Sequence, residues 1–247
     1  MKYVIGNWKM NPTELPRALE LIRATEAAIP AGTPRGCVAI AAPFVYLHPL
    51  ACETAAVALA AQDTFWDQAG AYTGQVSPAM LKGLGVRYVL IGHSERRTHA
   101  FETDAHITHK VRAALDANLR VILAVGSRAR SEAAVLRDIR RQLRVLDVLG
   151  SGRAQGRRDL LIAYEPLVAI GTGQAAPVDH VRRVAAEISR LSGAPVLYGG
   201  SISRKNASTY LALPELAGVL VGSASLRARE FAAIIQAAEQ LSHHHDS

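Results

Sequence analysis

The fold is decided by the stretch Leu160-Leu161-Ile162-Ala163-Tyr164-Glu165-Pro166, which is followed closely by Ala169-Ile170-Gly171-Thr172-Gly173. The short apolar run predicts a β-strand, and the carboxylate of Glu165 falls where that strand ends. The loop that follows is rich in glycine, whose unobstructed backbone amides can close over an anion. The stretch therefore predicts a base beside an anion-binding lid. An acidic residue that merely ends a strand before an ordinary loop is the alternative interpretation.

Short apolar runs of this kind alternate with amphipathic stretches along the whole chain. We expect strands at Lys2–Asn7, Cys37–Ala41, Val57–Gln62, Tyr88–Ile91, Arg120–Val125, Leu160–Tyr164, Pro195–Tyr198 and Gly218–Val221. The helices between them include Glu14–Ile29, Asp104–Ala117, Glu132–Val148, Asp179–Ser192 and Phe231–Leu241.

The strand runs are mostly continuous rather than alternating, which is typical of parallel strands that are buried on both faces. Strands and helices in this order fit either an open doubly wound sheet or a closed (β/α)8 barrel. Nearly every predicted strand ends in a polar or glycine-rich turn. This placement favours the α/β barrel, whose functional groups gather at the C-terminal rim.

Length and composition are those of one domain. With 247 residues, 49% of them hydrophobic, the chain can form a single large core. We expect residues 1–242 to form the barrel, and residues 243–247 to be a disordered tail with three histidines, either native or the remnant of a tag. No apolar run is long enough for a membrane helix, and the N-terminus lacks a secretory signal. A cytoplasmic protein without a membrane partner is expected.

Charge and cysteine content exclude other classes. The formal charge is +7, but the arginines between Arg128 and Arg144 are spread over a predicted helix without aromatic residues among them. A solvated helix face is therefore favoured over a nucleic-acid site. Cys37 falls in a predicted strand and Cys52 in a predicted helix, without metal-ligand spacing. We expect two buried reduced thiols and no metal site.

The first predicted strand leads into Asn7-Trp8-Lys9. Asn7 and Lys9 are two residues apart, so in an extended chain their side chains point to the same face. This arrangement aims a neutral donor and an ammonium together at the rim. A lysine after a strand is also a common structural feature.

The fourth predicted strand leads into Gly92-His93-Ser94-Glu95. Ser94 is suited to cap a short helical turn. Because His93 would feel the positive end of the helix dipole, we expect a neutral ring that can donate a hydrogen bond. A carboxylate at Glu95 close to Lys9 would hold that ammonium in place. Both His93 and Glu95 are equally compatible with structural roles.

The last two strands lead into Tyr198-Gly199-Gly200-Ser201 and Val221-Gly222-Ser223-Ala224-Ser225. Turns with glycine after the seventh and eighth strands are where (β/α)8 barrels commonly bind phosphate. Each turn alone could reflect tight packing, but together with the loop at Gly171 they predict a phosphate site.

Four segments now stand in order along the chain: Gly6-Asn7-Trp8-Lys9-Met10-Asn11, Ile91-Gly92-His93-Ser94-Glu95-Arg96-Arg97, Ala163-Tyr164-Glu165-Pro166 with its glycine loop, and Tyr198-Gly199-Gly200-Ser201. Together they closely resemble the triosephosphate isomerase family, from Lys2 to about Leu241. The resemblance implies a single-domain TIM barrel. It also implies the interconversion of dihydroxyacetone phosphate and D-glyceraldehyde 3-phosphate in glycolysis and gluconeogenesis, without a metal or organic cofactor.

The resemblance also implies catalytic roles. Glu165 would remove a proton from the carbon next to the carbonyl and return it to the neighbouring carbon through an enediolate. Neutral His93 would polarise the carbonyl and move protons between the two substrate oxygens. Lys9 would stabilise the negative charge, Asn7 would complete the set of donors, and Glu95 would orient Lys9.

The remaining expectations concern the phosphate, the lid and the partner. The phosphate of the triose would rest on the amides of Gly171, Ser201, Gly222 and Ser223. The loop from Ala71 to Gln75 resembles the segment that enters the partner subunit, which implies a homodimer with Thr73 close to Asn7 of the partner subunit. The lid would comprise Pro166, Val168, Ala169, Ile170, Thr172 and Gly173.

The chain departs from the family pattern at several positions. The family commonly has Trp at Val168 and Glu at Ser127, a pair that would touch across the lid hinge, so their loss predicts an altered open state. Gly is common where Ser223 stands, and Gln75 replaces a Glu that could pair with Arg96. An isomerase of a four-carbon phosphoketose and a non-catalytic phosphate-binding barrel are the alternative functions. The joint presence of all four catalytic groups argues against a binding module.

Overall fold

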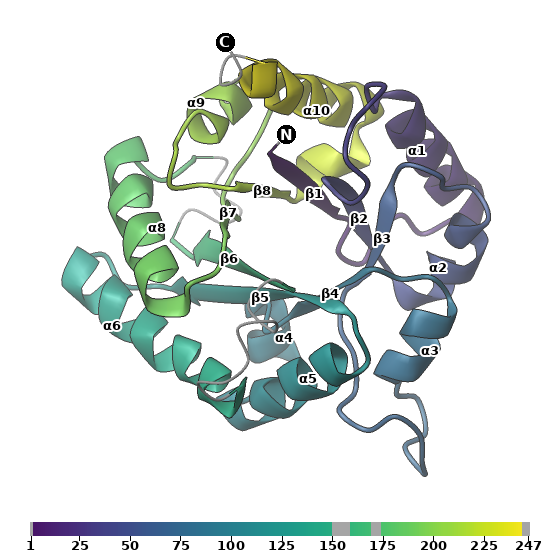
Figure 1. The fold of residues 1–247 in the computed structure, drawn as a ribbon, viewed down its shortest axis with the longest axis horizontal. Helices are drawn as coiled ribbons and strands as arrows, with labels where there is room; N and C mark the ends of the chain where they lie inside the picture. The colour runs from purple at the N-terminus through teal and green to yellow at the C-terminus, as the bar shows by residue number, and fades with distance from the viewer. Residues whose placement is uncertain (1, 150–158, 169–173, 244–247) are drawn as a thin grey trace.

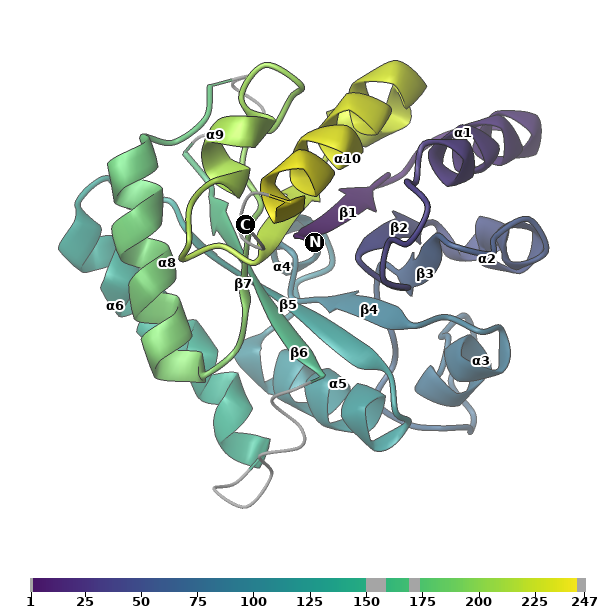
Figure 2. The same cartoon turned by 45° about the horizontal axis from the view of Figure 1, so that its top comes forward.

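The computed structural model describes residues 2–149, 159–168 and 174–243. Eight parallel strands close into a barrel that helices surround (Figure 1). Each strand pairs with the next one in the sequence, and β8 returns to pair with β1, so that Tyr3 lies opposite Gly218 and Gly6 opposite Val221. In the oblique view of Figure 2, α6 and α8 lie side by side on the outside of the barrel. The predicted fold class is confirmed.

The bounds of the elements are as follows. The strands are β1 (Tyr3–Asn7), β2 (Val38–Ala42), β3 (Ala58–Ala61), β4 (Tyr88–Ile91), β5 (Arg120–Ser127), β6 (Leu160–Pro166), β7 (Val196–Tyr198) and β8 (Gly218–Val221). The α-helices are α1 (Leu15–Ala27), α2 (Phe44–Ala51), α3 (Pro78–Gly83), α4 (Ser94–His99), α5 (Asp104–Asp116), α6 (Glu132–Leu143), α8 (Val178–Ser192), α9 (Ala207–Leu211) and α10 (Ala228–His243). Two 3-10 helices are η1 (Arg144–Leu149) and η2 (Ser223–Leu226).

The core has two layers because successive side chains of a strand face opposite sides. In β2, Ala39 and Ala41 point into the barrel, whereas Val38 and Ile40 pack against the surrounding helices. The barrel interior is filled by side chains, with small alanines on β2 and β3 and the fully buried Tyr88 on β4. Because both faces of each strand are buried, the strands read as continuous apolar runs.

The helices have recognisable sequence causes. In α8, Val181, Val184 and Ile188 recur at helical spacing and are buried. The helix ends at Gly193, whose φ of 64° is a left-handed conformation that glycine adopts without strain. At the start of α5, Thr103 accepts a hydrogen bond from the backbone of His106, whose side chain in turn accepts one from Thr103.

Several predicted boundaries need correction. Strand β6 runs on to Pro166, because Glu165 and Pro166 pair in register with Gly126 and Ser127 of a longer β5. Pro166, predicted to belong to the lid, is therefore the last residue of a strand. The helix predicted over 132–148 ends as an α-helix at Leu143 and continues as η1. His243, predicted to begin the tail, is the last residue of α10.

The prediction of two buried thiols was wrong. Cys37 is half-buried and lies one residue before β2, whereas Cys52 is exposed at the C-terminal end of α2. The two cysteines form no disulfide in the described part of the chain. Within the described ranges, no helix combines the length and the apolar character that a membrane span requires.

Candidate active site

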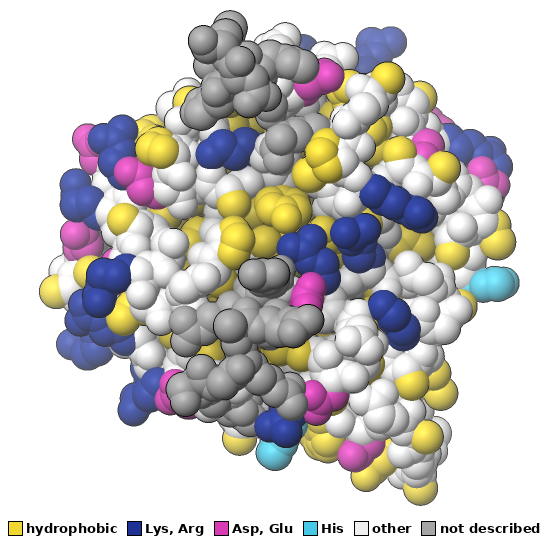
Figure 3. Space-filling model, viewed as in Figure 1, with side chains coloured by type: hydrophobic (Ala, Val, Ile, Leu, Met, Phe, Trp, Pro, Cys, Tyr) yellow, Lys and Arg dark blue, Asp and Glu magenta, His cyan; other side chains and the backbone are white. Residues whose placement is uncertain are grey.

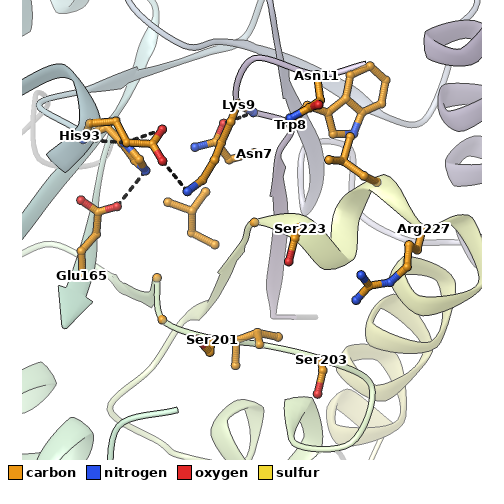
Figure 4. A pocket seen from close by; sticks show the side chains of 17 residues that line it. Asn7, Trp8, Lys9, Asn11, His93, Glu165, Ser201, Ser203, Ser223 and Arg227 are labelled. Atoms are coloured by element: carbon orange, nitrogen blue, oxygen red, sulfur yellow. Dashed lines mark hydrogen bonds and ion pairs between the residues drawn. The ribbon is translucent and has the colours of Figure 1, made fainter. Parts of the chain in front are cut away.

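A cavity of about 550 Å³ opens at the C-terminal ends of β1, β4, β6, β7 and β8. Because the strands are parallel, these ends meet at one rim and bring together residues that are distant in sequence. In Figure 4, His93 and Glu165 lie on one side of the cavity, and Ser201, Ser223 and Arg227 lie across from them. Figure 3 shows basic side chains gathered near the centre of one face of the molecule, beside apolar ones. The cavity has a volume typical of small-molecule sites.

The carboxylate of Glu165 is enclosed by the segment that follows β4. Its side chain is 3% exposed, and its Oε1 lies 2.9 Å from Nε2 of His93. The backbone amide of Ser94 donates a hydrogen bond of 3.0 Å to Oε2. Both oxygens of this buried carboxylate therefore have partners on one short segment.

His93, and not Ser94 as predicted, is the N-cap residue of α4. Its Nδ1 accepts a hydrogen bond of 3.2 Å from the amide of Glu95. Gly92 precedes it with a φ of 75°, a conformation that other residues rarely adopt. A ring nitrogen that accepts a hydrogen bond carries no proton, so the neutral ring bears its proton on Nε2 and donates it toward Glu165.

The electrostatics of His93 differ from the expectation of a depressed pKa. Burial lowers the pKa of the imidazole. The charge and hydrogen bond of Glu165, together with the charge of Glu95, raise this pKa by more than burial lowers it, so the net pKa is above the ordinary value. The sequence indicated a helix N-terminus but gave no measure of how close Glu165 would come. Charge at 2.9 Å outweighs the weaker field of a six-residue helix.

Lys9 is held in an unusual backbone conformation. Its φ of 54° lies in the left-handed region, which is costly for a residue with a Cβ. The conformation is fixed by Asn7, whose Oδ1 accepts the Lys9 amide at 3.0 Å, and by Gln62, whose Nε2 donates to the Lys9 carbonyl at 2.8 Å. Nζ of Lys9 lies 2.5 Å from Oε1 of Glu95. Asn7 and Glu95 thus both position Lys9.

The opposite wall of the cavity consists of the turns after β7 and β8. Gly199, Gly200 and Ser201 follow β7, and Gly222 and Ser223 follow β8. A Cβ on Gly200 would lie 2.2 Å from the hydroxyl of Tyr198, so only glycine fits there. Turns with glycine and serine at this rim are suited to binding a phosphate through backbone amides.

Nine residues of the lining were not among the predicted site residues: Trp8, Asn11, Gly199, Gly200, Ile202, Ser203, Leu220, Leu226 and Arg227. Trp8 and Asn11 belong to the motif after β1, but their spacing did not indicate whether their side chains would face the cavity. Arg227 follows η2 by one residue and adds a second cation to the wall near Ser223. A basic residue just after the phosphate turn was the available signal for Arg227.

The predicted lid and partner segments are only partly described. Val168 is 51% exposed, and the predicted residues Ala169, Ile170, Gly171, Thr172 and Gly173 lie outside the described residues. Thr73 is exposed and lies in a turn closed by a hydrogen bond of 3.0 Å from the Gln75 amide to the Tyr72 carbonyl. The loop between β3 and α3 projects away from the barrel in Figure 1. In this chain Thr73 is remote from the cavity lining.

No group of three His, Cys, Asp or Glu side chains in the described part of the chain is arranged to hold a metal ion. The cavity instead combines a buried carboxylate, an imidazole and an ammonium, which are groups that move protons and stabilise negative charge. A closed (β/α)8 barrel with such groups at its C-terminal rim belongs to the class of barrel enzymes.

Comparison with known sequences specifies the family. A sequence model described as triosephosphate isomerase matches residues 2–238. The triosephosphate isomerase of Delftia acidovorans is 41% identical over 251 residues, covering 96% of this chain and 99% of its own length. Those of Acidithiobacillus ferrooxidans and Moorella thermoacetica are each 41% identical, covering 96% and 94% of this chain and 96% of their own lengths. The chain belongs to the triosephosphate isomerase family and is an isomerase.

Proposed function

We propose that the cavity at the C-terminal rim is where this chain interconverts dihydroxyacetone phosphate and D-glyceraldehyde 3-phosphate, and that Glu165 is its catalytic base. The observation that carries the assignment is the buried Glu165 carboxylate, 2.9 Å from the His93 ring and facing a wall of glycine turns. The reaction is that of the family, and its substrate is a phosphorylated triose. We further propose that the chain up to the end of α10 at His243 forms one catalytic domain that works in the cytoplasm.

The reaction begins with proton removal. Glu165 takes a proton from the carbon next to the carbonyl, and the electron pair of that C–H bond moves to form an enediolate. Nε2 of His93 donates its hydrogen bond to the developing oxyanion and passes protons between the two substrate oxygens. Glu165 then returns its proton to the neighbouring carbon. Because Oε1 of Glu165 and the substrate oxygen both require Nε2 of His93, substrate must replace the contact between these two residues.

The enediolate is stabilised by charge that is already in place. Nζ of Lys9 is fixed by Glu95, and the Lys9 backbone is fixed by Asn7 and Gln62. A positioned ammonium in a partly buried site stabilises negative charge without reorganisation during the reaction. Lys9 therefore acts on the enediolate and the phosphate, while Asn7 and Glu95 hold it in position.

The phosphate rests on the turns across the cavity. Amides of Ser201, Gly222 and Ser223 supply its donors, together with Gly171 of the loop after β6. A lid that begins after Pro166 and extends to residue 173 closes over the bound substrate and excludes water, which keeps the enediolate from losing its phosphate.

The active unit is a homodimer in this proposal. Several large apolar side chains that follow β1 to β4 are exposed in the isolated chain: Met10, Phe44, Val45, Tyr72, Met80 and Phe101. An exposed group of this size and composition is typical of a protein interface. The projecting loop with Thr73 at its tip enters the partner near Lys9 and Asn7 of that subunit.

Replacing the base tests the assignment most directly. We expect Glu165→Gln to slow turnover by about 100- to 10,000-fold, the usual contribution of a general base, in a coupled assay with glyceraldehyde 3-phosphate. Binding of a phosphate-containing substrate analogue should persist, because the turns after β7 and β8 are unchanged. Glu20→Gln, which removes an exposed carboxylate from α1, is the matched control. Near-normal turnover in Glu165→Gln would contradict the assignment.

A further inference from the structure

A second cavity, of about 450 Å³, opens at the N-terminal ends of β3, β4 and β5. Since the strands are parallel, this cavity lies at the end of the barrel opposite Glu165. Four cationic side chains line it: Arg35, Lys82, Arg87 and Arg120. No Asp or Glu occurs among its described lining residues. The proposed active site, by contrast, contains both signs of charge.

Arg120 is anchored at the inner end of this cavity by neutral groups. Its NH1 donates to the hydroxyl of Tyr88 at 2.8 Å, and its NH2 donates to that of Tyr3 at 3.3 Å. Its Nε also forms an ion pair of 3.8 Å with the half-exposed carboxylate of Asp159. The Arg120 side chain is only 19% exposed, so a mostly buried cation is compensated by a distant, solvated acid.

A second guanidinium lies against the same aromatic ring. The centre of the Arg120 guanidinium is 5.1 Å from the centroid of the Tyr88 ring, and that of Arg87 is 5.9 Å away. Gly36 allows this approach, because a Cβ at that position would lie 2.8 Å from Nε of Arg87. Two like charges therefore share one ring at the edge of the cavity.

Unlike Arg120, the outer cations Arg35, Lys82 and Arg87 lack acidic partners within the described part of the chain. Arg35 and Arg87 take part in no ion pair there, and Lys82 donates to the carbonyl of Asn118 at 2.8 Å, which leaves its charge uncompensated. Exposed arginines elsewhere on the surface are commonly paired, as Arg23 is with Glu53. An unbalanced group of cations in a concave site favours an anion that neutralises several of them at once.

We propose that this basic cavity binds a small polyanion with at least two phosphate groups. Guanidinium groups match phosphate oxygens through paired hydrogen bonds, and a single phosphate, with a charge of about −2, would not neutralise the four cations of the lining. Buried apolar residues of the floor, among them Val57, Leu59 and Val86, leave room for a non-polar part of the ligand. The site is independent of the proposed catalytic function, since it shares no lining residue with the rim cavity.

Calorimetric titration with inorganic pyrophosphate tests the proposal. The titration is done with saturating glycerol 3-phosphate, a reduced analogue of the triose, so that the rim cavity is already filled. We expect one pyrophosphate per chain under these conditions. Arg87→Gln should weaken its binding by about tenfold or more, the usual effect of losing one charge-assisted hydrogen bond. Arg137→Gln, an exposed substitution on α6, should change it by less than about twofold.

Two results would overturn the proposal. Loss of all pyrophosphate binding once glycerol 3-phosphate fills the rim cavity would show that pyrophosphate enters only that site. Equal weakening by Arg87→Gln and Arg137→Gln would show general attraction to a basic surface. Unchanged isomerase activity of Arg87→Gln would establish that the variant is folded. Arg35→Gln provides a second variant with the same expected loss.

Discussion

Nε2 of His93 lies 2.9 Å from Oε1 of Glu165, so the proposed electrophile and the proposed base contact each other in the site without substrate. Both side chains are largely buried, at 8% and 3% exposure. Their interaction competes with substrate, because the same Nε2 must turn its hydrogen bond to the substrate oxygen. The contact therefore links the protonation of His93 to the presence of ligand.

The first prediction concerns the pKa of His93. Without ligand, this pKa should lie above the ordinary value of about 6.5. Burial lowers it, but the charge and hydrogen bond of Glu165, together with the charge of Glu95, outweigh the effect of burial. In Glu165→Gln it should fall below the wild-type value, because burial remains while the charge is gone. Titration of the ring nitrogen chemical shifts measures both values. An unchanged His93 pKa in the variant would contradict the prediction.

The raised pKa has a consequence for stability. Since the folded pKa of His93 exceeds its unfolded value, the contact contributes stability that is fully present below about pH 6.5 and is lost as pH rises through the folded pKa. The free energy of unfolding of the wild type, compared with that of Glu165→Gln across this window, should show a difference that shrinks with rising pH.

The second prediction concerns a buried charge cluster under α4. Nζ of Lys110 lies 2.7 Å from Asp63 and 2.5 Å from Glu102, and Arg96 contacts both carboxylates. Lys110→Met leaves these two carboxylates buried beside one remaining cation, so we expect a loss of about 3–5 kcal/mol in the free energy of unfolding. Urea denaturation measures the change. Arg17→Met, which removes an exposed cation of α1, should cost less than about 1 kcal/mol. Equal losses in the two variants would show that the cluster does not stabilise the fold.

The sequence allowed prediction of the strands because their two buried faces leave an unbroken apolar signal. All eight predicted strands overlap those of the barrel. Their ends were less predictable, because pairing extends them: Gly126 belongs to β5 through its register with Glu165, which no local propensity indicates. The C-terminal end of α6 was obscured similarly, since the apolar spacing continues into η1.

The residues of the candidate site could be predicted because the topology of the barrel brings strand ends together. Asn7, Lys9, His93 and Glu165 each follow or end a strand, and a parallel barrel brings such ends to one rim. Side-chain contacts between distant segments could not be predicted in this way. Nε2 of His93 and Oε1 of Glu165 lie within hydrogen-bond distance of each other, and strand order alone does not fix side-chain positions that closely. Arg227 was missed because its contribution depends on the direction in which η2 places it.

The third prediction concerns assembly. Thr73 is exposed at the tip of its loop, so Thr73→Arg should leave the folded chain intact but introduce a charge at the proposed interface. We expect the dimer dissociation constant to rise by about tenfold or more, with a parallel fall in activity at low protein concentration. Sedimentation at a series of concentrations measures it, with Ala133→Arg on the exposed face of α6 as the control. A fully active wild-type monomer would rule out the dimer.

The last prediction concerns Ser127, where the resemblance to the family led us to expect Glu. Its hydroxyl donates to Oδ2 of Asp138 at 2.5 Å and accepts from the Ala129 amide at 3.0 Å, and its carbonyl accepts from the Leu167 amide at 3.2 Å. Ser127→Glu would remove the hydroxyl bonds and place a second carboxylate against Asp138. We expect a loss of about 1–3 kcal/mol in the free energy of unfolding.

We therefore expect Asp138 to repel a glutamate at position 127. If repulsion by Asp138 is the cause, adding Asp138→Ala to Ser127→Glu should recover at least about 1 kcal/mol relative to the sum of the single changes, as measured in a double-mutant cycle.

With the repulsion removed, Val168→Trp can be added to rebuild a hinge contact of the open lid. A contact worth about 1 kcal/mol in the open state alone should weaken the binding of a transition-state analogue about fivefold. Ser127→Glu with undiminished stability in the presence of Asp138 would contradict the first step. Unchanged analogue binding in the folded triple variant would contradict the second and leave the substitutions at 127 and 168 without influence on the lid.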